Sequence, residues 1–309
     1  MRFRPTRILC ATDFSDPVSR VAVSHAARLA RKFAGKVFLC HVADLTPATL
    51  YESPRLVLTT LEEIRRKADE QIRALMKDED VQWEPLVLEG HPSSRIVQIA
   101  DELDADIVVV ATHGRSALRR LFLGSVTHEL LHTLKRPLLI VREGSREGPG
   151  AAGRELDIQK MVVGCDFSAN GELAVSYASS LAQELQAELC LLHVLEPWAY
   201  QDLVPSTKGM AEDLRAAVRG VIENRMAKLV DREARSWVRV RTVIASGKPS
   251  AEIVTFAERE HADLVVVGSS GMGAIGRLLV GSTAEAVVRH ATVPVLVVRE
   301  PSDREEKKE

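Results

Sequence analysis

The chain has 309 residues, of which 46% are hydrophobic and 27% are charged, and its formal net charge is −2. At about 150 residues per domain this length predicts two globular domains. The near-neutral charge gives no electrostatic basis for non-specific binding to nucleic acid or to a membrane surface. Apolar runs stay shorter than the about 20 residues that span a bilayer, and no signal peptide is apparent. We therefore expect a cytoplasmic protein with no membrane partner and no specific nucleic-acid partner.

Each half of the chain consists of apolar runs that alternate with segments of helical periodicity. In the first half the expected elements are strand 7–12, a helix that follows Asp16-Pro17 and ends at Gly35, strand 36–42, a helix at about 57–78, strand 82–88, helix 92–103, strand 106–111, helix 124–133 and strand 137–141. The second half follows the same order and has a long charged helix at about 209–235.

Strands that are apolar throughout and alternate with helices are typical of a parallel sheet covered on both faces. Right-handed crossovers then give a doubly wound, Rossmann-like α/β fold with a five-stranded parallel sheet in each half. We expect domain 1 over residues 1–143, a glycine-rich linker over 144–156, domain 2 over 157–300 and a disordered charged tail over 301–309.

The two halves carry the same motif at a constant spacing. Residues 111–126 and 268–283 both fit [G/A]-x2-G-x9-G-S, and each segment follows an apolar run and precedes a helical one. The back half of each repeat aligns at an offset of 157 residues, and the front half aligns at 153, since Asp13 matches Asp166. A strand that leads through a glycine-bearing loop into a helix is a geometry that binds phosphate through backbone N–H groups.

An aspartate follows the first strand of each half, at Asp13 and at Asp166. Ligands of open α/β sheets lie beyond the carboxyl ends of the strands, where strand order reverses, so we expect each aspartate beside its glycine loop. A carboxylate repels phosphate but accepts hydrogen bonds from a ribose hydroxyl or an adenine amine. This combination predicts a nucleotide whose phosphates lie on the glycines. Glycines that only make tight turns are the alternative interpretation.

These features resemble the UspA-like universal stress protein family, whose ATP-binding signature is G-x2-G-x9-G-[S/T] beside an early aspartate. The resemblance implies tandem domains of the adenine nucleotide alpha hydrolase-like type that bind ATP, or AMP or ADP, with Mg²⁺ as an optional companion. In the second half, the implied nucleotide-binding positions are Cys165, Asp166, Val194, Gly268, Gly271, Met272, Gly281, Ser282 and Thr283. In the first half, they are Thr12, Asp13, Val42, Ala111, Gly114, Arg115, Gly124, Ser125 and Val126.

Domain 2 is expected to be the better nucleotide site, because it matches the signature in full whereas Ala111 replaces the first glycine in domain 1. The loop of domain 1 instead carries Arg115, Arg119 and Arg120, which either pair with phosphates or form a solvated face. We expect the two repeats to pack as a pseudo-dimer through their fifth strands, and pairing of two chains as a homodimer is a further expectation.

Three functions are compatible with these patterns. The first hypothesis is an ATP-binding regulatory protein of stress adaptation that has no catalytic residue. The second is a scaffold or partner-binding protein whose nucleotide sites are vestigial or hold another small ligand. The third is a slow ATPase, which we rank last because one carboxylate per site, without a second acid or a lysine, is thin support for hydrolysis.

A histidine pair lies outside this nucleotide pattern. His128 and His132 are four residues apart on a predicted helix, a spacing that is compatible with a zinc site. The second repeat has Glu285 and Arg289 at the same positions, so the pair is not shared, and we favour a surface pair over a metal site.

Two other histidines and the cysteines complete the candidates. His41 and His193 each end a strand at the same place in the repeat, and we expect them to fix loop geometry through hydrogen bonds rather than to catalyse. The cysteines lie in or beside apolar strands and form no C-x2-C pair, which favours reduced thiols over a redox or metal role. They are Cys10, Cys40, Cys165 and Cys190.

Overall fold

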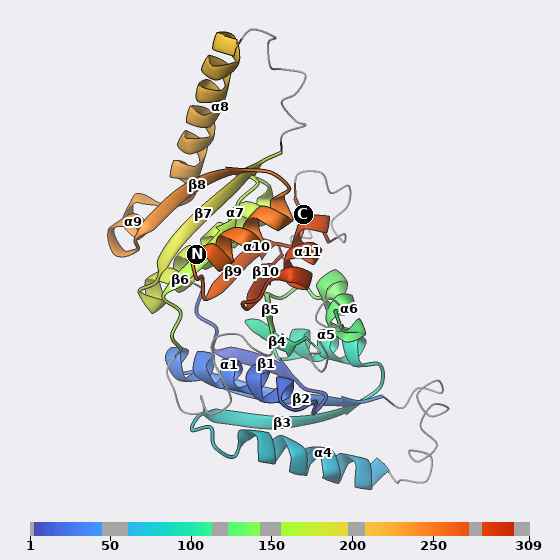
Figure 1. Ribbon diagram of the computed structural model, residues 1–309. Helices are drawn as coiled ribbons and strands as arrows, with labels where there is room; N and C mark the ends of the chain where they lie inside the picture. Colours follow the sequence, from blue (N-terminus) through green and yellow to red (C-terminus); the bar gives the residue numbers. More distant parts are fainter. Residues whose placement is uncertain are drawn as a thin grey trace, which may run out of the picture. The chain divides into compact units, whose positions relative to one another are not determined.

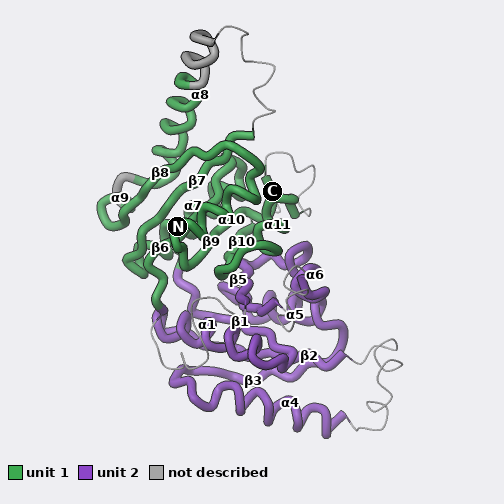
Figure 2. The backbone as a smooth tube through the Cα atoms, viewed as in Figure 1, with its two compact units in different colours: residues 1–3, 157–309 green, residues 4–156 purple. Residues whose placement is uncertain are grey.

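The computed structural model describes residues 3–44, 61–112, 123–142, 156–196, 208–271 and 280–299. The chain divides into two compact units (Figure 2). One unit comprises residues 4–156 and is called domain 1 below; the other comprises residues 157–309 with residues 1–3 and is called domain 2. The expected tail and nearly all of the expected linker lie outside the described residues. None of the described helices combines the length and the apolar character that crossing a membrane requires.

Domain 1 contains one sheet of parallel strands flanked by helices (Figure 1). Its strands are β1 (Arg7–Ala11), β2 (Lys36–Ala43), β3 (Gln82–Glu89), β4 (Ile107–Ala111) and β5 (Leu138–Val141). Its described helices are α1 (Val18–Phe33), α4 (Leu61–Met76), α5 (Pro92–Glu102) and α6 (Ser125–Thr133). The strand order is β3-β2-β1-β4-β5, so the order reverses between β1 and β4.

Domain 2 repeats this arrangement. Its strands are β6 (Lys160–Gly164), β7 (Glu188–Leu195), β8 (Val240–Ser246), β9 (Leu264–Gly268) and β10 (Val295–Val298). Its described helices are α7 (Ala169–Leu185), α8 (Lys208–Leu229), α9 (Arg232–Trp237), α10 (Pro249–Arg259) and α11 (Ser282–His290). The strand order is β8-β7-β6-β9-β10, and the reversal lies between β6 and β9.

The central strands of both domains are buried because helices cover both faces of each sheet. Right-handed crossovers place α1 and α4 on one face of domain 1 and α5 and α6 on the other, and the helices of each pair contact one another. Pro85 lies in the edge strand β3, where the missing N–H costs no ladder hydrogen bond. This is the doubly wound α/β fold predicted from the alternating pattern.

Two details differ from the predicted elements. The expected helix at about 209–235 is two helices, because α8 ends at Leu229 and Asp231 takes the N-cap position of α9. The helix after Asp16 begins at Val18, with Pro17 at the N-cap position and no side-chain cap. An aspartate just before a helix is a common N-cap, but Asp16 does not cap this helix and pairs with Arg20 instead.

The aspartates that precede β4 and β9 tie these strands to the start of the first strand of each domain. Asp106 Oδ2 accepts hydrogen bonds from the backbone N–H groups of Thr6 and Arg7, each at 2.8 Å. Asp263 Oδ2 accepts the equivalent bonds from Gln159 and Lys160 at 3.0 and 2.9 Å. Both domains thus have the same contact at the end of the sheet opposite the glycine loops, with an offset of 157 residues for the aspartates and 153 for the residues that donate to them.

Phe3 packs with domain 2 although the chain enters domain 1 immediately afterwards. Its backbone N–H donates to Ser180 Oγ at 2.6 Å, and the Ser180 hydroxyl is 3.2 Å from the Phe3 carbonyl oxygen. The Phe3 ring lies 4.4 Å from the ring of Tyr177, and the side chain is buried. These contacts hold the N-terminal residues against α7.

Candidate functional site

The candidate site of domain 2 lies where strand order reverses. β6 and β9 pair as far as Val163 and Val266, after which the two strands leave the shared ladder. Beyond this point β6 continues into Cys165 and Asp166, and β9 continues into the glycine loop that starts at Gly268. Parallel strands deliver both segments to the same edge of the sheet, which is where open α/β sheets bind ligands.

Asp166 and three glycines of the signature come together there. A Cβ atom added to Gly271 would lie 2.5 Å from Asp166 Oδ2. A Cβ atom added to Gly281 would lie 3.4 Å from the Cα atom of Ser270 and 3.5 Å from the backbone nitrogen of Gly271. At Gly268 the same addition would lie 2.6 Å from the backbone carbonyl carbon of Asn170. The structure thus assembles these predicted residues, whereas Met272 lies outside the described residues.

The turn that carries Asp166 is ordered by its own hydrogen bonds. Asp166 Oδ1 accepts bonds from the backbone N–H and the hydroxyl of Ser168 at 3.0 and 2.6 Å. Ser168 is in turn the N-cap of α7 and accepts a bond from the Gly171 N–H at 3.1 Å. Since a carboxylate offers about four lone-pair positions, Asp166 keeps capacity for a ligand donor.

One amide of the signature is already used inside the protein. The Gly281 N–H donates to the Ser269 carbonyl at 2.8 Å, so it does not point to an anion. Gly281 occupies the N-cap position of α11 and provides no side-chain cap. The first N–H groups of a helix have no intrahelical acceptor. The backbone N–H groups that we expect to bind an anion are therefore those of Ser282 and Thr283, at the positive end of the helix dipole.

His193 and His41 hold the turn after the first strand in their respective domains. His193 Nδ1 lies 2.7 Å from the Cys165 carbonyl oxygen, and His41 Nδ1 lies 2.9 Å from that of Thr12. Each ring also contacts the phenylalanine after the aspartate. The ring centroids are 4.8 Å apart for His193 and Phe167 and 4.2 Å apart for His41 and Phe14. The hydrogen bonds agree with the expected role in fixing loop geometry. Val42 and Val194 follow these histidines in β2 and β7.

These two histidines are expected to make the protein less stable in weak acid. Burial lowers the pKa of His41 and of His193 below the ordinary value of about 6.5. The unfolded chain therefore binds more protons than the native state as pH falls from about 6.5, and the free energy of unfolding decreases over that window. Urea denaturation at about pH 7.5 and about pH 5.5 measures the decrease. An equal pH dependence in the His41→Gln/His193→Gln double variant would contradict this account.

The equivalent site of domain 1 is described only in part. Asp13 Oδ1 accepts a bond from the Ser15 N–H at 2.9 Å, and Thr12 Oγ1 donates to Ser19 Oγ at 2.8 Å. The loop residues of domain 1, including Gly114 and Arg115, lie outside the described residues. After that loop, Gly124 takes the N-cap position of α6, and Ser125 and Val126 begin the helix.

The helix that follows the first strand begins at different positions in the two domains, and we infer that this difference makes room for Ala111 in domain 1. The backbone that a Cβ atom at Gly268 would strike belongs to Asn170, in the first turn of α7. With the front offset of 153 residues, Asn170 matches Pro17, which precedes α1 rather than lying within it. Helix α7 begins two positions earlier than α1 in the repeat, so its first turn occupies the space beside the strand end.

Arg225 of α8 was not among the predicted site residues. Its guanidinium carbon lies 4.1 Å from the centroid of the Phe167 ring, and His193 lies against the same ring. Domain 1 has Gln71 at the matching helical position, because the buried residues of α4 and α8 align at an offset of 154. The sequence predicts only a long charged helix here, and the contact depends on the register of that helix relative to Phe167.

For the nucleotide site that the sequence predicts in domain 2, Arg225→Gln is expected to weaken ATP binding about two- to fivefold, because loss of an exposed cation–π contact loosens the turn beside Asp166. Isothermal titration with ATP measures the change. Arg219→Gln is the matched control on the same helix, since Arg219 pairs with Glu223. Equal ATP affinities for the two variants would show that Arg225 is not part of the site.

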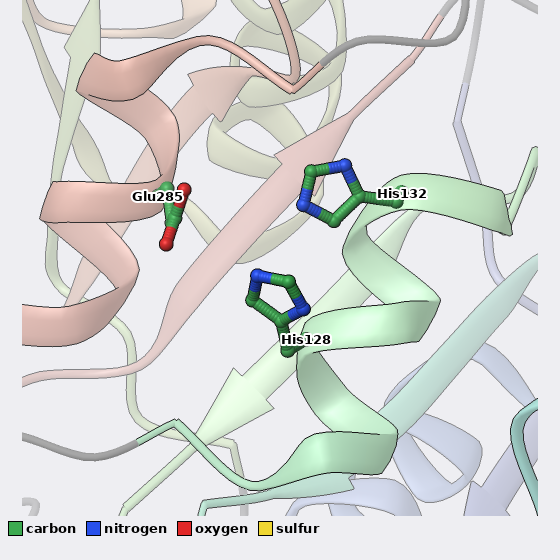
Figure 3. Close-up of side chains that lie close together, drawn as sticks. All are labelled: His128, His132 and Glu285. Carbon is green, nitrogen blue, oxygen red and sulfur yellow. The ribbon is translucent and has the colours of Figure 1, made fainter.

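His128 and His132 lie one turn apart on α6 (Figure 3). Their ring centroids are 4.7 Å apart. At the equivalent positions of domain 2, Arg289 Nη2 is 2.6 Å from Glu285 Oε1 in an ion pair. The two domains therefore use the same helical spacing for different pairs.

All four cysteines are buried and free. Burial raises the pKa of Cys40 to about 12 and that of Cys165 to about 11. It also raises the pKa of Cys10 and of Cys190. Their thiols are therefore protonated near neutral pH, which makes them poor nucleophiles and poor metal ligands.

Comparison with known proteins decides the family. The sequence model of the universal stress protein family matches residues 5–142 and again residues 157–299. The chain belongs to the universal stress protein family. The two matches confirm the tandem UspA-like organisation predicted from the repeat, and the α/β Rossmann-like fold of both domains agrees with it.

Relatives in this family resemble the chain over nearly its whole length. A universal stress protein of Mycolicibacterium smegmatis is 30% identical over 297 residues, which cover 94% of this chain and 96% of that protein. One from Mycobacterium tuberculosis is 28% identical over 294 residues, covering 92% and 93%. The crystal structure of a universal stress protein from Archaeoglobus fulgidus has the same fold, with a TM-score of 0.64, 23% identity and coverage of 96% and 99%.

Proposed function

We propose that this universal stress protein binds an adenine nucleotide, ATP in the first place, and acts as a regulatory protein in stress adaptation, with domain 2 as the better site. The observation that carries the proposal is the approach of Asp166 to Gly271 at the reversal of strand order. It joins a hydrogen-bond acceptor for ribose or adenine to a loop whose backbone a phosphate can approach closely.

The proposed roles follow from the chemistry of each group. Asp166 accepts hydrogen bonds from the sugar or base, and Val194 lies in the neighbouring strand β7 on the base side. Gly271 keeps a side chain out of the space beside Asp166, where the loop backbone would approach the phosphates, and Gly268 lets the end of β9 pack against the first turn of α7. Ser282 and Thr283 offer N–H groups and hydroxyls at the start of α11. Mg²⁺ would be held mainly through the phosphates, as this ion commonly is.

Binding is tested with the purified full-length chain. Native mass spectrometry is expected to detect bound adenine nucleotide, and equilibrium titration is expected to show tighter binding of ATP than of GTP. Titration with and without Mg²⁺ separates the contribution of the ion. The proposal would be refuted if the purified protein carries no nucleotide and if ATP at about 1 mM gives neither heat nor a thermal shift, since a dissociation constant of about 1 mM corresponds to very weak binding.

A partner-binding protein with vestigial sites is the second candidate. The observation that favours it is the hydrogen bond from the Gly281 N–H to the Ser269 carbonyl, which removes one amide from the anion site. The pairing of the two repeats, the pairing of two chains and the cytoplasmic location remain predictions. Sedimentation measures the mass of the assembly directly.

A further inference from the structure

Helix α6 presents two imidazole rings on the same side (Figure 3). Residues four apart lie one above the other on a helix, so His128 and His132 are held next to each other by the backbone. Their planes are inclined at 48°, and a ring nitrogen of one lies within 4.8 Å of a ring nitrogen of the other. His128 is exposed, and His132 is partly buried.

Chelation requires these ring nitrogens to move closer together by rotation of the side chains. Zinc and neighbouring metals bind imidazole nitrogen at about 2.0–2.1 Å, so two nitrogens on one ion are about 2.9–3.4 Å apart. Since the helix fixes both rings in advance, the second nitrogen binds intramolecularly at high effective concentration. Imidazole favours Cu²⁺, Ni²⁺ and Zn²⁺, whereas Mg²⁺ prefers oxygen ligands.

The neighbouring acidic residue belongs to a different contact. Glu129 Oε2 accepts a hydrogen bond from Ser93 Oγ and lies 3.7 Å from His91 Nδ1. Ser93 is in α5, so this carboxylate bonds to the neighbouring helix. In domain 2 the matching positions form the Glu285–Arg289 ion pair. The histidine pair is therefore a feature of domain 1 and not a requirement of the fold.

We propose that His128 and His132 form a two-histidine binding site for a late first-row divalent cation, namely Cu²⁺, Ni²⁺ or Zn²⁺. Water or other oxygen ligands complete the coordination of the ion. The two histidines are not among the implied nucleotide-binding positions, although Gly124, Ser125 and Val126 lie at the start of the same helix.

The test is titration of the untagged, nucleotide-free full-length chain with Ni²⁺ and Zn²⁺. The wild type is expected to bind one ion at this site, and His128→Gln and His132→Arg are each expected to bind about 10–100-fold more weakly. The double variant His128→Glu/His132→Arg installs the pair that α11 already carries, so the helix has a tolerated alternative. His290→Gln, at the exposed end of α11, is the control and should bind like the wild type. Mg²⁺ should give no heat.

Electron paramagnetic resonance with one equivalent of Cu²⁺ identifies the ligands. The wild type is expected to show hyperfine coupling to two imidazole nitrogens, and the double variant should lose both. Circular dichroism confirms that each variant is folded. Unchanged Ni²⁺ and Zn²⁺ affinities in the folded double variant, or an unchanged Cu²⁺ spectrum, would overturn the assignment.

Discussion

Gly268→Ala is expected to destabilise domain 2 by about 1–3 kcal/mol, because the added methyl group overpacks a rigid contact. Its Cβ atom would lie 2.6 Å from the carbonyl carbon, 2.7 Å from the carbonyl oxygen of Asn170 and 2.9 Å from the Gly171 nitrogen. These are backbone atoms of the first turn of α7, which cannot rotate out of the way. Urea denaturation of the full chain measures the loss.

Two substitutions serve as controls for this effect. Gly281→Ala is expected to be nearly neutral for stability, since its Cβ atom has no neighbour closer than 3.4 Å among the described residues. Ala111→Gly tests the reverse exchange in domain 1, where it removes a methyl group that the later start of α1 accommodates. If Gly268→Ala is as stable as Gly281→Ala, the different starts of α1 and α7 do not explain why domain 1 has Ala111 where domain 2 has Gly268.

Asp166→Ala is expected to weaken ATP binding about 10- to 100-fold, in line with the loss of a hydrogen bond to a charged group. The carboxylate lies beside Gly271 and accepts two bonds from Ser168. Its removal therefore takes away both a ligand contact and the order of the turn. Isothermal titration measures the affinity, and urea denaturation separates the structural part.

Asp166→Asn separates these two roles further, because an amide retains one oxygen for the Ser168 bonds. Asp13→Ala is the matched variant of domain 1 and is expected to change the total ATP affinity little, because domain 2 is the proposed main site. A larger effect from Asp13→Ala than from Asp166→Ala would reverse the order of the two sites.

The architecture was predictable because it depends on patterns that the chain repeats. Apolar strands between amphipathic segments gave the parallel sheets, and the offsets of 153 and 157 residues located equivalent positions in both domains. The strand order then placed Asp166 and the glycine loop at one edge of the sheet. The prediction of one long helix at about 209–235 was wrong, because Asp231 takes the N-cap position of a new helix. Charge and periodicity do not reveal this local effect.

The details of the site were less predictable, since they depend on how segments distant in sequence face each other. The motif identifies Gly281 but does not disclose that its N–H bonds to Ser269. Arg225 belongs to no motif, and its place over the Phe167 ring follows only from the register of α8. Likewise, the sequence motif does not show that α1 and α7 start at different positions, which is the difference that we connect with Ala111.

Equilibrium binding of ATP to Gly281→Trp tests the nucleotide site of domain 2 most directly, with Gly124→Trp as its counterpart in domain 1. A Cβ atom at Gly281 has only ordinary contacts, with the backbone of Ser269, Ser270 and Gly271, so the substitution places an indole beside this backbone without a clash at its first carbon. The account predicts that Gly281→Trp remains folded and loses most of the ATP binding, whereas Gly124→Trp retains it. Wild-type affinity in folded Gly281→Trp would contradict the account.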